Sequence, residues 1–150
     1  MREAIRRAVE NVTSGQGGPF GAVVVKDGRV IAAGINLVTA MNDPTAHAEV
    51  NAIREACSAL GTFQLTGCEL YTSCEPCPMC LGAIYWARPD RVYFAATASD
   101  AAAAGFDDSF IYEELKVAHG QRKIPFEMMM RDAGNEPFRE WMKKNDRARY

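Results

Sequence analysis

The most informative segments of this chain are His47-Ala48-Glu49 and Pro76-Cys77-Pro78-Met79-Cys80. The first cysteine, Cys77, follows the histidine by thirty positions. Together they offer one imidazole and two thiols, which we predict to bind a single zinc ion through His47, Cys77 and Cys80. Three protein ligands leave the fourth position of tetrahedral zinc open to water, as in catalytic zinc sites. The predicted cofactor is therefore Zn²⁺, and the predicted site is catalytic.

Glu49 has a separate role in this prediction, because it lies too close to His47 in the chain to share the metal easily. Zinc lowers the pKa of its bound water from about 15.7 to about 7, and the Glu49 carboxylate can accept the proton that this water loses. It would then deliver the proton to a substrate ring nitrogen and afterwards to the departing amine, a contribution of roughly 10²–10⁴-fold. Histidine-x-glutamate ahead of proline-cysteine-x-x-cysteine is typical of zinc-dependent nucleobase deaminases. We therefore expect a hydrolytic deaminase.

Both zinc-binding segments are predicted to lie at helix starts. Asp43-Pro44 indicates the start of the helix that carries the histidine. Pro78 begins another helix, so Cys77 and Cys80 are three positions apart on one helical face. A helix N-terminus carries partial positive charge and favours thiolates, the form that binds metal. The two helix starts must meet, and strands of one sheet feeding both helices would allow this.

Two other kinds of metal site are compatible with parts of the pattern. A closed structural zinc site could take Cys68 or Cys74 as its fourth ligand, but it has no use for Glu49 beside the metal. The spacing of the cysteines at 74, 77 and 80 resembles the start of an iron–sulfur motif, yet the next position of such a motif is Ile84. Cys57 and Cys68 lie in apolar patterns and are predicted to be buried thiols.

The composition indicates one globular enzyme domain spanning residues 1–150. A chain of 150 residues with 48% hydrophobic and 24% charged residues can bury a core unaided. Five cysteines, an odd number with close spacing, indicate free thiols in a reducing compartment. No apolar run is long enough to span a bilayer, and a net charge of −2 suggests no basic surface. We therefore expect a cytoplasmic protein with no membrane segment and no nucleic-acid partner.

Hydrophobic spacing predicts the elements that carry these segments. A helix is expected from Ala4 to Val12, stopped by Gly15. A hairpin follows, with strands over 20–25 and 30–35 and a turn at Asp27-Gly28. The next helix is expected to run from Asp43-Pro44 to a stop at Gly61, with a buried stripe of Ala46, Val50, Ile53, Cys57 and Leu60. The later elements are a strand over 68–72, a helix over 78–87, a strand over 91–96, a helix over 109–117, a strand over 126–130 and a helix over 136–144.

The order of these elements predicts the fold class. The strands over 68–72 and 91–96 are joined by a helix, which indicates a parallel pair connected by a crossover. The hairpin adds antiparallel strands, so the sheet should be mixed. Helices on both faces of such a sheet give an α/β fold, a three-layer α/β/α sandwich with a mixed central sheet.

The chain resembles a known family over most of its length. The segments 17–23, 42–49 and 71–80 resemble the cytidine-deaminase superfamily. More narrowly, the segments 84–89 and 104–112 and the terminal Tyr150 look like the bacterial guanine deaminases. This resemblance implies the cytidine-deaminase-like fold and the conversion of guanine to xanthine and ammonia, with activity on related aminotriazines as a further expectation.

The resemblance also implies roles for individual residues. Asn36 matches an asparagine that hydrogen-bonds the purine, Phe20 and Trp86 match aromatic walls of the pocket, and Asp108 matches a carboxylate near the amine that is replaced. Considered by residue type alone, Asn36 could equally be a turn residue and the two aromatic side chains could be core. Asp108 could cap the helix expected from Ser109.

A homodimer is a further implication of the resemblance. The family commonly exchanges C-terminal segments, here about 136–150, so that Tyr150 would close the pocket of the partner.

Two alternatives to a guanine deaminase stay open at this point. The first is a tRNA adenosine or cytosine deaminase, which shares the metal motif; a tRNA enzyme needs a positive surface to hold RNA. The second is a non-enzymatic zinc-binding module, and an intact Glu49 argues against it.

Overall fold

The computed structural model describes residues 1–148, so the predicted site residue Tyr150 lies outside the described part of the chain. The chain divides into two compact units, Met1–Asp108 and Ser109–Tyr150. Both zinc-binding segments belong to the first unit. Along the described residues no helix combines the length and the apolar character that crossing a membrane requires.

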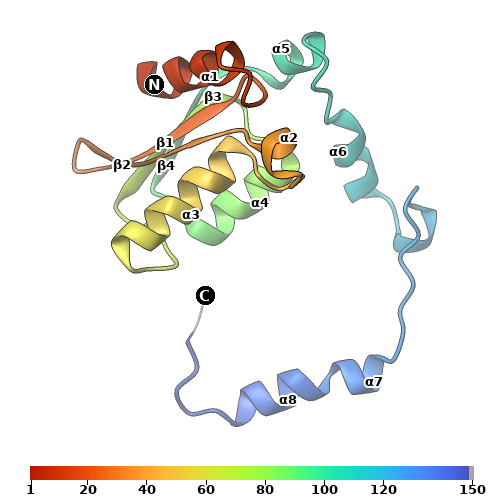
Figure 1. Cartoon of the computed structure of the whole chain (residues 1–150). Helices are drawn as coiled ribbons and strands as arrows, with labels where there is room; N and C mark the ends of the chain where they lie inside the picture. Colours follow the sequence, from red (N-terminus) through yellow and green to blue (C-terminus); the bar gives the residue numbers. More distant parts are fainter. Residues whose placement is uncertain (149–150) are drawn as a thin grey trace. The chain divides into compact units, whose positions relative to one another are not determined.

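The first unit is organised around a mixed four-stranded sheet (Figure 1). Its strands are β1 (Gly21–Lys26), β2 (Arg29–Ile35), β3 (Cys68–Cys74) and β4 (Arg91–Ala96), in the spatial order β2-β1-β3-β4. β1 is antiparallel to β2 and β3, whereas β3 and β4 are parallel. The hairpin turns at Asp27 and Gly28, whose φ angles of 49° and 73° suit a tight two-residue turn. The predicted hairpin, parallel pair and mixed sheet are confirmed.

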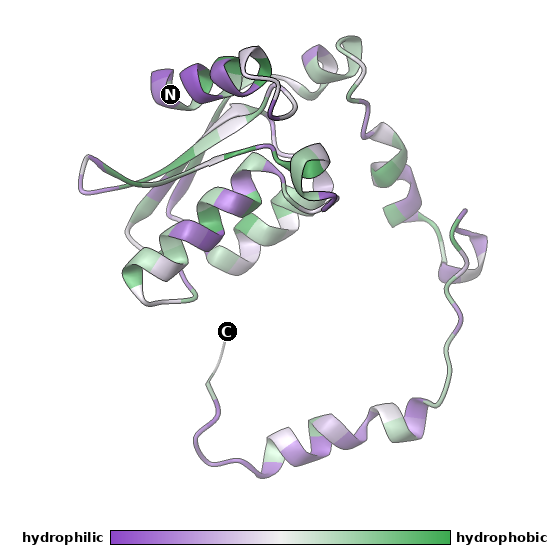
Figure 2. Ribbon diagram, viewed as in Figure 1, coloured by the Kyte–Doolittle hydropathy of each residue, from purple (hydrophilic) through white to green (hydrophobic). Residues whose placement is uncertain are grey.

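Helices cover both faces of this sheet, which confirms the α/β/α sandwich. α1 (Arg2–Thr13) lies on one face, and α3 (Ala48–Leu60) and α4 (Pro78–Ala87) lie on the other (Figure 1). α3 ends at Gly61 in the left-handed conformation, as predicted. In Figure 2, hydrophilic and hydrophobic segments alternate along α3, as expected for a helix with only one face on the sheet.

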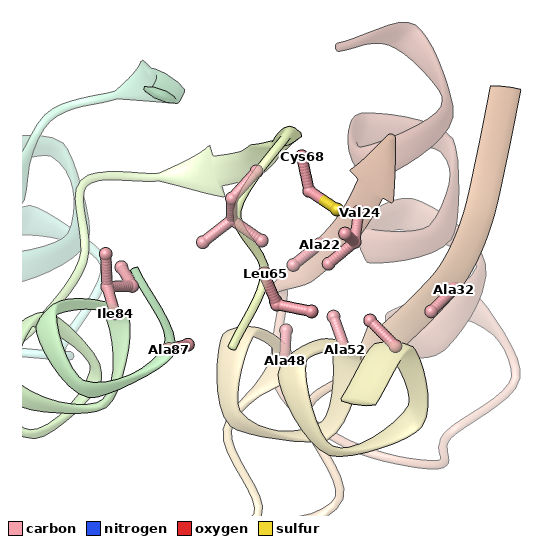
Figure 3. Packing of buried hydrophobic residues seen from close by; sticks show 11 residues of the cluster. Ala22, Val24, Ala32, Ala48, Ala52, Leu65, Cys68, Ile84 and Ala87 are labelled. Atoms are coloured by element: carbon pink, nitrogen blue, oxygen red, sulfur yellow. The ribbon is translucent and has the colours of Figure 1, made fainter. Parts of the chain in front are cut away.

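The core between the sheet and α3 is built largely from small side chains. Ala48 and Ala52 point from α3 toward the sheet and toward Leu65 (Figure 3). A Cβ atom at Gly34 of β2 would lie only 2.1 Å from the main-chain oxygen of Ala48, so no side chain fits between strand and helix there. This close approach sets the first turn of α3, which carries Glu49, directly against the sheet.

Two details of the predicted helix over 43–61 are wrong. The helix begins at Ala48, because the Asp43 carboxylate instead accepts hydrogen bonds from the amide and the hydroxyl of Thr45, at 2.8 and 2.7 Å, and forms a turn. A short helix, α2 (Val38–Met41), precedes that turn. Of the predicted stripe, Ala46 and Val50 are buried, whereas Ile53, Cys57 and Leu60 are partly buried and pack against the core. The close contact with β2 favours alanines, so the fully buried positions of the helix are Ala48, Glu49, Val50, Ala52 and Ala56.

The second unit contains short helices, and its described residues form no buried core. Its helices are α6 (Ser109–Lys116), a 3₁₀ turn at His119–Gln121, α7 (Arg131–Gly134) and α8 (Glu136–Lys143). They confirm the helices expected over 109–117 and 136–144. A short helix of the first unit, α5 (Ala98–Ala103), was not predicted. Within the described residues 109–148 no side chain is buried.

The strand predicted over 126–130 is wrong for the single chain. This segment has no strand assignment, and Phe126, Met128, Met129 and Met130 are all exposed. A strand needs a neighbouring strand edge to satisfy its amides and carbonyls. The apolar residues over 126–130 predict strand propensity, but propensity without a paired edge does not make a strand.

Candidate active site

The two zinc-binding segments meet because each stands at a helix N-terminus on the same face of the sheet. His47 is the N-cap of α3, and Cys77 is the N-cap of α4, where Pro78 occupies the first helical turn. The His47 Nδ1 atom lies 3.6 Å from the Cys77 Sγ atom and 3.5 Å from the Cys80 Sγ atom. The three donor atoms all lie within 4.8 Å of one another. The sequence prediction that these residues come together is confirmed.

These distances fit a tetrahedral zinc ion. With Zn–S bonds of about 2.3 Å and Zn–N bonds of about 2.0–2.1 Å, a tetrahedral angle gives an S···N separation of about 3.6 Å. The two S···N separations in the structure agree with that value. Among the described residues the ligand cluster consists of His47, Cys77 and Cys80, and neither Cys68 nor Cys74 belongs to it. The donor set therefore fits an open zinc site rather than a closed structural one.

The surroundings of the two cysteines change the pKa values of their thiols and favour a thiolate at Cys77, which can bind a cation. The pKa of Cys77 is lowered to about 4, chiefly by the hydrogen bond from the Cys80 thiol and further by His47 and the Cys80 amide. The same contact with Cys77, together with burial, raises the pKa of Cys80. The Cys77 thiolate in turn raises the pKa of His47. One thiolate is thus available before a metal arrives, and a bound metal ion displaces the proton of the second thiol.

Glu49 lies beside the ligand cluster and is nearly inaccessible to solvent, with 5% of its surface exposed. Its Oε1 atom accepts a hydrogen bond from the Thr72 hydroxyl at 3.0 Å, and its Oε2 atom lies 3.4 Å from the Cys80 Sγ atom. Burial raises the pKa of Glu49, which favours a group that can hold a proton as well as release one. Thr72 was missed by sequence reasoning because a strand threonine carries no motif signal.

A cavity opens in front of these residues. It is lined by Phe20, His47, Glu49, Cys74, Glu75, Cys77, Ala98, Ala101, Phe106 and Asp108. Phe106 packs edge-to-face on Phe20 with ring centroids 5.0 Å apart and was not predicted. Burial raises the pKa of Asp108. The structure thus brings two of the residues suggested by the family resemblance, Phe20 and Asp108, to the predicted metal site.

Of the other predicted substrate residues, Asn36 lies next to the cavity wall, because its amide donates a hydrogen bond to the main-chain oxygen of Phe20 at 3.1 Å. Asn36 is buried, its side-chain oxygen accepts a hydrogen bond from the Val38 amide at 3.3 Å, and its main-chain oxygen accepts one from the Asn11 side chain at 2.8 Å. Trp86 is 63% exposed. Neither Asn36 nor Trp86 is among the residues that line the cavity, so their binding roles stay predictions. Asn11, a fully enclosed residue of α1 that sequence reasoning missed, holds the segment around Asn36.

We expect one zinc ion per purified chain and a large loss of zinc in Cys80→Ala, because that variant removes one of three ligands. Elemental analysis of wild type and variant measures this directly. Cys68→Ala is the matched control, since it also removes a buried sulfur but from the core rather than from the cluster. Equal zinc content in wild type and Cys80→Ala would contradict the ligand assignment.

Comparison with known proteins places this site in a family. Residues 1–96 match the family described as the cytidine and deoxycytidylate deaminase zinc-binding region. The guanine deaminase of Bacillus subtilis (strain 168) is 57% identical over 150 residues, which cover 100% of this chain and 96% of that protein. The tRNA-specific adenosine deaminase of the same organism is 38% identical over 152 residues, which cover 99% of this chain and 92% of that protein.

A solved structure resembles the whole chain. The X-ray structure of guanine deaminase from Bacillus subtilis matches with a TM-score of 0.96 and 57% identity, covering 99% of this chain and 95% of that chain. The likeness therefore extends through the second unit, beyond the residues matched by the family as a whole.

Proposed function

This chain belongs to the cytidine and deoxycytidylate deaminase family, and from that premise we propose that it is a zinc-dependent aminohydrolase that converts guanine to xanthine and ammonia. The observation that carries the proposal is the full-length likeness to a guanine deaminase in both sequence and structure. The tRNA-specific adenosine deaminase that also matches the full length is markedly less similar.

The residues of the site have two roles in the proposed reaction, metal binding and proton transfer. Zinc would be held by His47, Cys77 and Cys80 and would supply a water activated near neutral pH. Glu49 accepts a proton from that water and transfers it to the ring nitrogen beside the carbon that carries the amine. After the C–O bond has formed, Glu49 takes the remaining proton of the new hydroxyl group and passes it to the amine. A carbonyl forms, the C–N bond breaks and the amine leaves as ammonia.

The charge of the cavity favours a neutral base over a nucleic acid. Among the residues that line it, Glu49, Glu75 and Asp108 are acidic, and none is lysine or arginine. A phosphate close to these carboxylates would meet repulsion instead of the cationic contacts on which RNA affinity depends. Phe20 and Phe106 add an aromatic surface against which a planar ring can pack. This supports a free nucleobase as substrate, with Asp108 near the amine that is replaced.

We further propose a homodimer in which the C-terminal segments, about 136–150, are exchanged and Tyr150 closes the partner's pocket. Two features support this. First, β4 is one of the two edge strands of its sheet, so within the described residues its outer side is not paired with another strand. Second, the described residues of the second unit bury no side chain, and α8 exposes Phe138, Trp141 and Met142. Exposed apolar side chains of this size are characteristic of surfaces that a partner covers.

The compartment is proposed on the chemistry of the thiols. All five cysteines are free, and two of them must stay reduced to bind zinc. Free thiols persist in reducing compartments, so we propose a cytoplasmic enzyme that acts in purine metabolism.

The test is ammonia release from guanine, cytosine, adenine, cytidine and a tRNA anticodon stem under identical conditions. We expect guanine to be the preferred substrate. An aminotriazine with a neighbouring carbonyl presents the same edge as the pyrimidine ring of guanine, so it should react measurably but more slowly. Preference for the anticodon stem would favour the tRNA deaminase reading. No release from the triazine above background, at high enzyme concentration, would show that the imidazole ring of the purine is required.

A further inference from the structure

Thr72 lies on an inner strand of the sheet. It lies in β3, where its main chain is paired with Ala22 of β1 on one side and with Phe94 of β4 on the other. Its side chain is completely buried. A backbone held by strands on both sides fixes the hydroxyl in space, since the β-branched side chain has few accessible rotamers.

The hydroxyl of Thr72 is directed at one oxygen of Glu49. The distance from Thr72 Oγ1 to Glu49 Oε1 is 3.0 Å, between two side chains that come from different elements of the fold. The other carboxylate oxygen, Oε2, faces the zinc ligands and lies 3.4 Å from Cys80 Sγ. The two oxygens therefore have different environments, one anchored to the sheet and one turned to the site.

We infer that Thr72 is a positioning residue for the deamination reaction: its hydroxyl anchors Glu49 Oε1 so that Oε2 alone serves the proton transfers. This inference rests on the proposed function of Glu49 as the proton carrier. A glutamate has three rotatable side-chain bonds, and without the anchor its carboxylate plane can turn away from the site. Proton transfer requires the carboxylate within hydrogen-bond reach of both water and substrate, so lost orientation lowers turnover more than binding.

The test is the isosteric substitution Thr72→Val, which keeps the shape of the side chain and removes the hydroxyl. We expect the kcat for guanine to fall by about 10- to 100-fold, the range expected for a hydrogen bond to a charged group. KM and zinc content should change little, and Thr72→Ser should restore most of the activity. Cys68→Ala is the matched control, because it alters a buried side chain of the same strand, away from the site, and should leave kcat near that of wild type.

A double-mutant cycle separates positioning from a general structural effect. In a Glu49→Gln background, Thr72→Val should lower the residual rate far less than it does in wild type, because the group that it positions no longer carries protons. An equal loss in both backgrounds, or a Thr72→Val variant with normal kcat, would overturn the inference. Where Thr72→Val does not fold, Thr72→Ala compared with Thr72→Ser makes the same test. A wild-type protein that releases no ammonia from guanine would refute the proposed function instead.

Discussion

Replacing Glu49 by glutamine is expected to lower guanine turnover by at least ~10²-fold while zinc and fold are retained, because the amide cannot carry the proton between water, ring nitrogen and amine. The substitution preserves the size of a side chain that is almost completely buried. The amide oxygen can still accept the hydrogen bond from Thr72. Steady-state ammonia release, normalised to the zinc content of each preparation, measures the effect.

The matched control for this experiment is Glu55→Gln. Glu55 lies on the same helix, α3, and is exposed, so its substitution makes the same change of charge outside the site. Its activity should match wild type. Near-normal turnover in a zinc-loaded Glu49→Gln protein would mean that another group carries the proton, and Asp108 would then be the first residue to examine.

Deleting residues 145–150 is expected to reduce activity on the order of 10²-fold while leaving zinc content and the sheet intact. If the tail of one chain closes the pocket of its partner, its loss admits water and removes an orienting contact, so binding and turnover should suffer together. The ligand cluster and its supporting helices all belong to residues 1–108, which the deletion does not touch. Elemental analysis, circular dichroism and steady-state kinetics measure the three expectations.

A mixed dimer distinguishes exchange from a tail that serves its own chain. The truncated chain keeps an intact Glu49, whereas a full-length Glu49→Gln chain keeps the tail. In their mixed dimer the full-length tail would cover the intact zinc site of the truncated chain, and activity should return there. If mixed dimers are shown to form and no activity returns, each tail serves its own chain or only stabilises the dimer.

Sequence reasoning identified what depends on neighbouring residues. The three-residue spacing of Cys77 and Cys80, with Pro78 opening a helix between them, is realised as one turn of α4. Asp27-Gly28 adopts the tight turn that makes the hairpin. The chemistry of the ligand types then indicated zinc before any distance was known. The cysteine pair and the hairpin turn each depend on interactions within about one turn of chain, so local order carries that information.

Other features depend on contacts between distant parts of the chain. Thr72 stands 23 positions from Glu49, and no spacing rule connects a strand threonine with a helix glutamate. The predicted start of α3 was too early, because the Asp43 side chain accepts a hydrogen bond from Thr45 within a local turn. The close contact between Gly34 and α3 favours alanines on the buried face of the helix. Phe106 lines the cavity and packs on Phe20, a contact between segments far apart in the chain.

The sequence by itself therefore predicted the metal, the three residues that the structure brings together to hold it, the proton carrier expected beside them and the order of the elements. Tertiary structure alone decided which oxygen of Glu49 faces the site, which aromatic ring meets Phe20, and that the residues over 126–130 form no strand within one chain. The physical reason is the same in all three cases. A short motif specifies the functional groups and the local backbone geometry. Side-chain orientation, packing and strand pairing depend on which distant segments of the chain are in contact with it.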